Sequence, residues 1–131
     1  MKNILFVITL LASVNLHAQY YYNDIIGTQE INKRMKTYVA AKVQSVMATG
    51  YDAQGMKTTD FNEWQEVQAN GTILKINNRN GQIVTRQYYQ FDNNTRLMNT
   101  RDSSTDIQSI TEYTYAANGN LSTIRTTTKD S

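Results

Sequence analysis

From residue 42 onward, turn signals divide the sequence into segments that are long enough only for short β-strands. Clusters rich in Gly, Asn, Asp and Ser occur at residues 52–55, 69–71, 77–81, 92–95, 103–106 and 116–119. Apolar and polar residues alternate between the clusters, as in an antiparallel strand with one solvated face. Because every connection is short, consecutive strands are expected to pair as hairpins. The chain is therefore predicted to be mainly β, an antiparallel β-meander of hairpin repeats with about seven strands.

A helical periodicity precedes the predicted sheet. Over residues 28–41, apolar side chains recur at helical spacing, namely at Ile31, Met35, Tyr38 and Val39. Thr28 is the predicted N-cap, because its hydroxyl can accept a hydrogen bond from the first turn; Asp24 and Gly27 are alternative starting points. We expect one amphipathic N-terminal helix that packs on the sheet.

The first 18 residues are typical of a secretory signal peptide. Lys2 precedes an apolar run from Ile4 to Leu16, and Ala18 is a small residue of the kind that signal peptidase accepts. A helix of about 13 residues reaches about 20 Å, against a hydrocarbon core of roughly 30 Å. We expect cleavage after Ala18 and a secreted or periplasmic protein without a membrane span. Its mature part would comprise an extension and helix over residues 19–41 and the sheet over residues 42–131.

The composition excludes most catalytic chemistry. The chain has no Cys and no Pro, and its one His, His17, lies in the predicted signal peptide. The mature chain would thus lack the thiol and the imidazole that supply nucleophiles, general bases and metal ligands. We expect no enzyme activity, no cofactor and no metal. Removal of Lys2 lowers the formal net charge of +2 by one, which argues against nucleic acid as a partner.

The turns resemble one another in sequence. In each, an aromatic or aliphatic residue ends a strand, an Asp or a substitute follows, and a Gly or a substitute comes shortly afterwards. Asp caps such a turn through its side chain, and Gly supplies a positive φ. The residues predicted to build these turns are Tyr51, Asp52, Gly55, Gly71, Phe91, Asp92, Tyr115 and Gly119.

This pattern resembles the tyrosine-aspartate (YD) repeat of bacterial Rhs-type wall proteins and related secreted repeat proteins, over roughly residues 50–128. The copies are degenerate and depart from the repeat at Gln68, Thr95 and Ala116. The resemblance implies wrapped sheets that serve as structural shells or extracellular binding surfaces and are not catalytic. Since about four copies cannot close a shell, we expect a small secreted sheet. It would be a fragment of a longer repeat protein, or its edge strand would pair with a partner or a second copy.

Aromatic residues are the best candidates for binding. Alternation leaves Trp64 and Tyr88 free to face outward, whereas four other rings are expected in the core, namely Tyr89, Phe91, Tyr113 and Tyr115. Exposed rings stack on sugars or hold an apolar partner, although cross-strand packing also accounts for them. The predicted function is a noncatalytic secreted or envelope-associated module that binds a glycan or a protein of the cell envelope.

Two alternatives remain open. The first is a glycosidase with a carboxylate pair, although alternation puts Glu63 and Glu66 on opposite faces and Asp92 lacks the sequence context of a calcium loop. The second is a small outer-membrane β-barrel, against which polar outward residues argue, namely Arg86, Gln90, Glu112 and Thr114. The carboxylates available to a glycosidase are Glu63, Glu66, Asp92, Asp102, Asp106 and Glu112.

Overall fold

The computed structural model describes residue 22, residues 24–103 and residues 107–130. The predicted signal peptide and its cleavage site at Ala18 lie outside these residues. The chain divides into two compact units between Ile31 and Asn32. Helical residues 24–31 belong to the first unit, whereas the rest of the helix and the sheet belong to the second.

The helix extends over residues 24–40 and so includes residues before the predicted start. Thr28 is buried within it, and the Thr28 hydroxyl donates a hydrogen bond of 2.7 Å to the carbonyl of Asp24. Such a bond to the carbonyl four residues earlier is one that Thr makes inside a helix. The prediction of Thr28 as the N-cap is therefore wrong.

The helix ends at a left-handed residue, Lys42, whose φ is 54°. The N–H of Lys42 donates to the carbonyl of Val39 over 3.1 Å, and the N–H of Val43 donates to the carbonyl of Tyr38 over 2.9 Å. These two bonds form a Schellman motif, which satisfies carbonyls that the last turn of a helix leaves unpaired. The chain then enters the first strand within three residues of Lys42.

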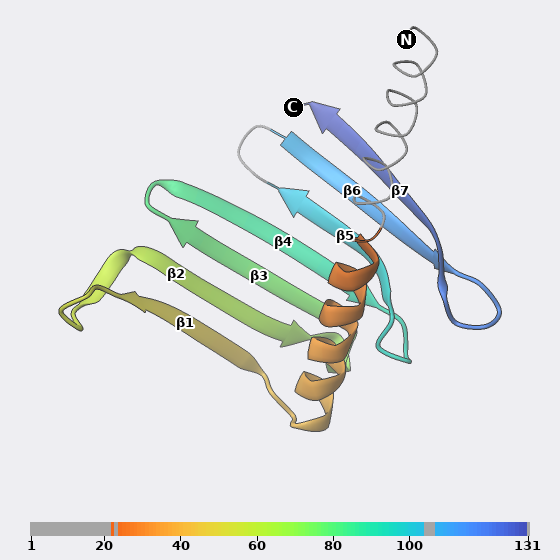
Figure 1. The fold of residues 1–131 in the computed structure, drawn as a ribbon, viewed down its shortest axis with the longest axis horizontal. Coiled ribbons are helices and arrows are strands. Elements are labelled where there is room, and N and C mark those ends of the chain that lie inside the picture. The colour runs from red at the N-terminus through yellow and green to blue at the C-terminus, as the bar shows by residue number, and fades with distance from the viewer. Residues whose placement is uncertain (1–21, 23, 104–106, 131) are drawn as a thin grey trace, which may run out of the picture. The chain divides into compact units, whose positions relative to one another are not determined.

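The seven strands form one antiparallel sheet, and their order in the sheet is their order in the chain (Figure 1). This confirms the predicted mainly β meander with an N-terminal helix. The first and last strands form the edges of the sheet. The strands are β1 (Ser45–Tyr51), β2 (Lys57–Gln68), β3 (Ile73–Asn80), β4 (Ile83–Phe91), β5 (Leu97–Ser103), β6 (Ile107–Tyr115) and β7 (Leu121–Asp130).

Three hairpin turns of the described residues share one backbone geometry. They follow β1, β4 and β6, and in each the residue after the aromatic one makes two backbone hydrogen bonds of 2.9–3.0 Å, to the residues three and four positions later. The residue three positions later is left-handed, with a φ of 79° at Gly55, 60° at Thr95 and 83° at Gly119. A register shift marks a β-bulge beside each turn, where the closing pairs are Tyr51 with Lys57, Phe91 with Leu97 and Tyr115 with Leu121.

The turn between β2 and β3 has a different geometry. Gln68 pairs with Ile73, so the loop between the paired positions is one residue shorter than in the three turns above. This loop contains a 3₁₀ turn, η1 (Ala69–Gly71). Gly71 is buried with a φ of 88°, and a Cβ there would lie 2.5 Å from Cγ2 of Val39. The helix therefore approaches this turn so closely that only glycine fits without displacement.

The connection between β3 and β4 is shorter than the sequence pattern predicts. Residues 77–80, which the pattern assigns to a turn, continue β3, and Asn80 pairs directly with Ile83. Only Gly81 and Gln82 remain in the loop, and Gly81 has a φ of 61°. Two residues are enough to connect antiparallel strands when Gly occupies the first of the two positions.

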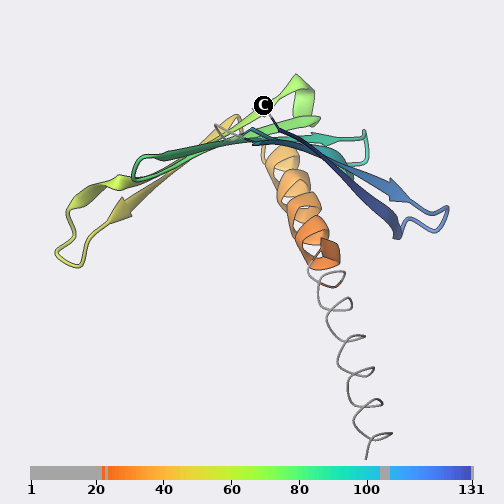
Figure 2. The same cartoon turned by 90° about the horizontal axis from the view of Figure 1, so that it is seen from above.

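The core of the second unit is small. Figure 2 shows that the sheet is curved and that the helix beyond Asn32 approaches its concave side. The buried apolar side chains of this unit are Met35, Leu74, Ile76, Phe91 and Leu97. Phe91 is thus buried, as predicted, whereas the other three predicted core rings, Tyr89, Tyr113 and Tyr115, are only half-buried.

Asn32 ties the helix to the backbone of β5 at Leu97. Its Oδ1 accepts a hydrogen bond of 2.7 Å from the N–H of Leu97, and its Nδ2 lies 3.5 Å from Oη of Tyr115. The Tyr115 hydroxyl in turn donates to the Leu97 carbonyl over 2.9 Å. Leu97 is only 2% exposed, so Asn32 satisfies a buried backbone donor that would otherwise have little access to water.

The substitution Thr95→Gly is expected to stabilise the protein. A non-glycine residue in the left-handed region costs roughly 1–2 kcal/mol, and part of this gain is offset by the greater freedom of Gly in the unfolded chain. Urea denaturation should show a free energy of unfolding that rises by up to about 1 kcal/mol. The reciprocal change Gly119→Thr, where a Cβ meets nothing within 4 Å, should lower it. A loss of stability in Thr95→Gly would contradict this account.

Removal of the Asn32 side chain is expected to destabilise the contact between helix and sheet. Asn32→Ala leaves the N–H of Leu97 without its acceptor, which should lower the free energy of unfolding by about 1–3 kcal/mol. Asn32→Asp keeps the Oδ1 acceptor and should lose less. Urea denaturation of the two variants distinguishes them, and equal losses would show that the Leu97 hydrogen bond is not the source of the stability.

Candidate functional site

The two faces of the sheet have different surroundings. Tyr38 of the helix donates a hydrogen bond of 2.8 Å from its hydroxyl to Oε1 of Gln65, which defines the helix face. Because side chains alternate along a strand, Trp64 lies on the opposite face. No helix of the second unit covers that side (Figure 2), which we call the open face.

The strand register places Trp64 in a row of side chains that crosses the whole open face. Trp64 pairs with Met47 on β1 and with Asn77 on β3, and Asn77 pairs with Arg86 on β4. The row continues over β5, β6 and β7 through Ser103, Gln108 and Lys129. Trp64 is 42% exposed within this row, so a large part of its ring is available to a ligand.

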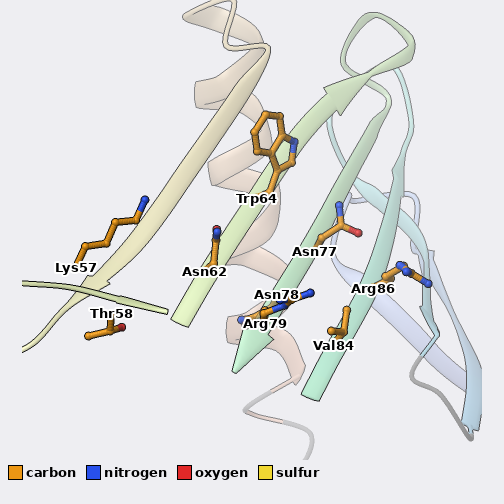
Figure 3. Close-up of a pocket in the computed structure, with 9 residues that line it drawn as sticks. All are labelled: Lys57, Thr58, Asn62, Trp64, Asn77, Asn78, Arg79, Val84 and Arg86. Atoms are coloured by element: carbon orange, nitrogen blue, oxygen red, sulfur yellow. The ribbon is translucent and has the colours of Figure 1, made fainter. Parts of the chain in front are cut away.

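An open pocket of about 660 Å³ surrounds Trp64. Figure 3 shows its lining residues on β2, β3 and β4, with Trp64 and Asn62 on β2 and with Val84 and Arg86 on β4. Three cationic side chains line the pocket, namely Lys57, Arg79 and Arg86, and the side chains that the structure describes add no carboxylate to it. Asn62 and Asn77, which share the open face with Trp64, add amide groups to the lining, whereas the Asn78 amide donates to Oε2 of Glu63 over 3.3 Å on the helix face.

Tyr88 also faces the open side but does not line this pocket. It pairs with Lys75, whose Nζ lies 5.8 Å from the centroid of the Tyr88 ring. At this distance the ammonium and the ring attract each other. The structure therefore does not bring the two predicted binding residues, Trp64 and Tyr88, together, and the face of the Tyr88 ring is already engaged by a neighbour.

The second pocket of the same unit, also about 660 Å³, lies at the end of the helix. It contains Lys42 together with the carboxylate of Glu66, and its one aromatic residue is Tyr38. The Tyr38 hydroxyl already donates to Gln65. The pocket at Trp64 is therefore the better candidate for a binding site.

The helix face carries hydrogen-bonded polar groups. Tyr89 donates from its hydroxyl to Oε1 of Gln87 over 3.0 Å, and Gln87 donates from Nε2 to Oδ2 of Asp102 over 3.1 Å. Burial raises the pKa of Tyr89, the neighbouring Tyr113 raises it further, and Arg34 partly opposes the shift. The Tyr89 hydroxyl therefore keeps its proton and its role as a donor near neutral pH.

The carboxylates are dispersed over the sheet. Glu63 and Asp102 share the helix face but lie on β2 and β5, three strand spacings or about 14 Å apart, whereas a glycosidase pair needs roughly 5–10 Å. Glu66 and Glu112 are farther apart, on β2 and β6 of the open face. Asp106 lies outside the described residues. Within the described ranges, no group of three or more His, Cys, Asp or Glu residues is placed to hold a metal ion.

The predicted turn residues Asp52 and Asp92 act as caps of the backbone. Oδ1 of Asp52 accepts from the N–H groups of residues 54 and 56, at 3.0 and 2.8 Å. Oδ1 of Asp92 accepts from residues 94 and 96, both at 2.9 Å. In the third turn Ala116 has no such group, and Asn118 accepts from the N–H of Asn120 over 3.0 Å instead.

Asp92 is also paired with Arg96, whose Nη2 lies 2.7 Å from Oδ2 of Asp92. Burial acts to raise the pKa of Asp92, but the hydrogen bonds from the backbone and side chain of Arg96 and from the N–H of Asn94 outweigh it. The pKa of Asp92 therefore lies below its ordinary value. The guanidinium of Arg96 also lies 5.2 Å from the centroid of the Tyr115 ring, which links this turn to β6.

The convergence of Lys57, Arg79 and Arg86 around Trp64 was not foreseen from the sequence. The alternation places Arg79 and Arg86 on the face of Trp64 only once the loop between β3 and β4 is known to contain two residues. The sequence feature that could have predicted this convergence is Gly81, because a two-residue hairpin there fixes the register of β3 and β4.

No family model matches the chain, and searches of curated proteins and of solved structures gave no match. The described residues contain no helix with the length and apolarity needed to cross a membrane.

Asp92→Asn is expected to lower stability and to weaken its dependence on pH. With a folded-state pKa below the unfolded value of about 3.9, ionised Asp92 stabilises the protein above that pH, and this contribution is lost as the pH falls through the folded-state pKa. Asp92→Asn should lower the free energy of unfolding at pH 7 by about 0.5–1 kcal/mol and flatten its fall in acid. Urea denaturation from pH 7 to pH 3 measures both effects. Asp52→Asn is the control, since Asp52 has no ion-pair partner among the described residues.

Proposed function

We propose that this chain is a noncatalytic secreted or envelope-associated module of YD-repeat type that binds a glycan of the cell envelope. The proposal is carried by one observation, the half-exposed Trp64 ring in a pocket on the open face. Indole rings present a flat apolar surface on which the C–H face of a sugar can stack. The proposed cleavage after Ala18 would deliver this surface to the periplasm or the cell exterior.

The polar lining of the pocket suits a hydroxylated ligand. Asn62 and Asn77 are adjacent to Trp64, one on the same strand and one across the pair. A primary amide offers two donors and an acceptor with two lone pairs, so each amide can serve as both donor and acceptor for sugar hydroxyls. A glycan therefore fits this lining better than a mainly apolar protein surface does.

The proposed absence of catalysis is supported by the chain's chemistry. The sequence contains no Cys, and His17 is its one His. The carboxylates of Glu63 and Asp102 serve as acceptors for side-chain amides, with Glu63 bound to Gln65 over 2.6 Å and Asp102 to Gln87 over 3.1 Å. Association of a partner strand with the edge strands β1 or β7 stays a prediction beside this function.

Trp64→Ala is expected to abolish or strongly weaken glycan binding without unfolding the protein. Loss of a central aromatic contact commonly costs tenfold or more in affinity, about 1.4 kcal/mol. Affinity measurements with glycans and proteins isolated from the envelope of the producing cells test this. Ile110→Ala is a matched control, because Ile110 is 40% exposed on the same face but lies on β6.

A Trp64→Ala variant that keeps its urea midpoint and every affinity of the parent protein would refute the proposed site. Loss of affinity for an envelope protein alone would assign the pocket to a protein ligand in place of a glycan.

A further inference from the structure

The sheet separates its charges by face. The register places every Lys and Arg of β3 to β7 on the open face. Among the residues that these pairings cover, the acidic ones on that face are Glu66 of β2 and Glu112 of β6. The pairings that establish this join Lys75 to Tyr88, Tyr88 to Arg101, Asn77 to Arg86, Asn62 to Arg79, Glu112 to Arg125 and Gln108 to Lys129.

The cations concentrate at the pocket of Trp64. Arg79 pairs with Asn62, and Arg86 pairs with Asn77, which is itself opposite Trp64. Arg86 is thus two strand spacings, or about 10 Å, from Trp64, and Arg79 is two residues or about 7 Å along β3 from Asn77. Lys57 completes the lining at the start of β2.

No ion pair neutralises these three cations within the part of the chain that the structure describes. Among the described residues, neither Lys57 nor Arg79 nor Arg86 makes an ion pair, and the carboxylate of Glu63 lies on the opposite face of β2. Like charges that converge in this way repel one another until an anion binds between them. A guanidinium binds carboxylate or sulfate oxygens through two parallel hydrogen bonds.

We infer that the ligand of the open face is an acidic polysaccharide, with a sugar ring on Trp64 and its carboxylates or sulfates at Arg79, Arg86 and Lys57. This inference rests on the proposed glycan-binding function and names its ligand class. The observations favour a sugar polymer over a nucleic acid, because amide side chains accompany a single Trp in the pocket. A single-stranded nucleic acid is held by several stacked aromatic rings along a cationic track.

The test compares polygalacturonate with its methyl ester, which has the same backbone without the charge. Isothermal titration should show that the parent protein binds polygalacturonate at least tenfold more tightly than the ester, and that this preference falls as salt is raised. The double variant Arg79→Gln/Arg86→Gln should lose at least tenfold in affinity for polygalacturonate and retain its affinity for the ester. Lys36→Gln is the control, because it removes one positive charge from the helix and not from the pocket lining. Its affinity for polygalacturonate should stay within twofold of that of the parent protein.

The outcomes separate the two proposals. Equal affinity for both polymers, lost in Trp64→Ala, would overturn the acidic preference and leave the glycan-binding function intact. Absence of binding to either polymer and to chondroitin sulfate would overturn both. Binding of oligo-dT as tightly as polygalacturonate would show a general affinity for polyanions and overturn the acidic-glycan assignment. Because Arg79 and Arg86 are exposed, an unchanged urea midpoint should accompany the loss in the double variant.

Discussion

The register of strand pairing is the constraint on which the surface of this protein depends. Side chains alternate with a period of two, so a slip of one residue in any strand would exchange its faces. The left-handed residues Gly55, Thr95 and Gly119 and the bulges beside them hold three of the hairpins in register. The basic side chains of β3 to β7 therefore share the open face.

The same register keeps a few groups beneath the helix. Leu74 and Ile76 of β3 are buried, and Gln65, the partner of Ile76 on β2, links Tyr38 to Glu63 through its amide. Such a small apolar core buries little apolar surface and therefore contributes little to the free energy of folding. The hydrogen bond from Leu97 to Asn32 thus matters more here than one bond would in a large domain, because it attaches the second half of the helix to β5.

Local patterns were sufficient to predict the architecture. Alternation and turn residues predicted the meander, the burial of Phe91 and the exposure of Trp64, since each depends on neighbours within one strand. Other predictions failed because they depend on residues outside a single strand. The predicted core rings of Tyr89, Tyr113 and Tyr115 are only half-buried, and two element boundaries differ. Thr28 resembles an N-cap locally but lies inside a longer helix, and residues 77–80 resemble a turn but pair in full with β4.

The pocket and the Asn32 contact could not be predicted in the same way. Asn32 binds Leu97, which is 65 residues away in the chain, and nothing in the sequence near either residue indicates the other. The lining of the pocket requires the register of three strands at once. A sequence pattern can show that Arg79 and Arg86 are polar strand residues, but their place beside Trp64 depends on the two-residue loop at Gly81.

The turns after β4 and β6 have the same geometry and start 24 residues apart, after Phe91 and Tyr115. One such interval contains two complete strands, which return the backbone to the same end of the sheet. Duplication of this interval within the gene would therefore widen the sheet by two strands and leave the strands at the helix undisturbed. The fold thus has a simple evolutionary route to longer relatives, in which the area available for ligands grows in increments of one hairpin.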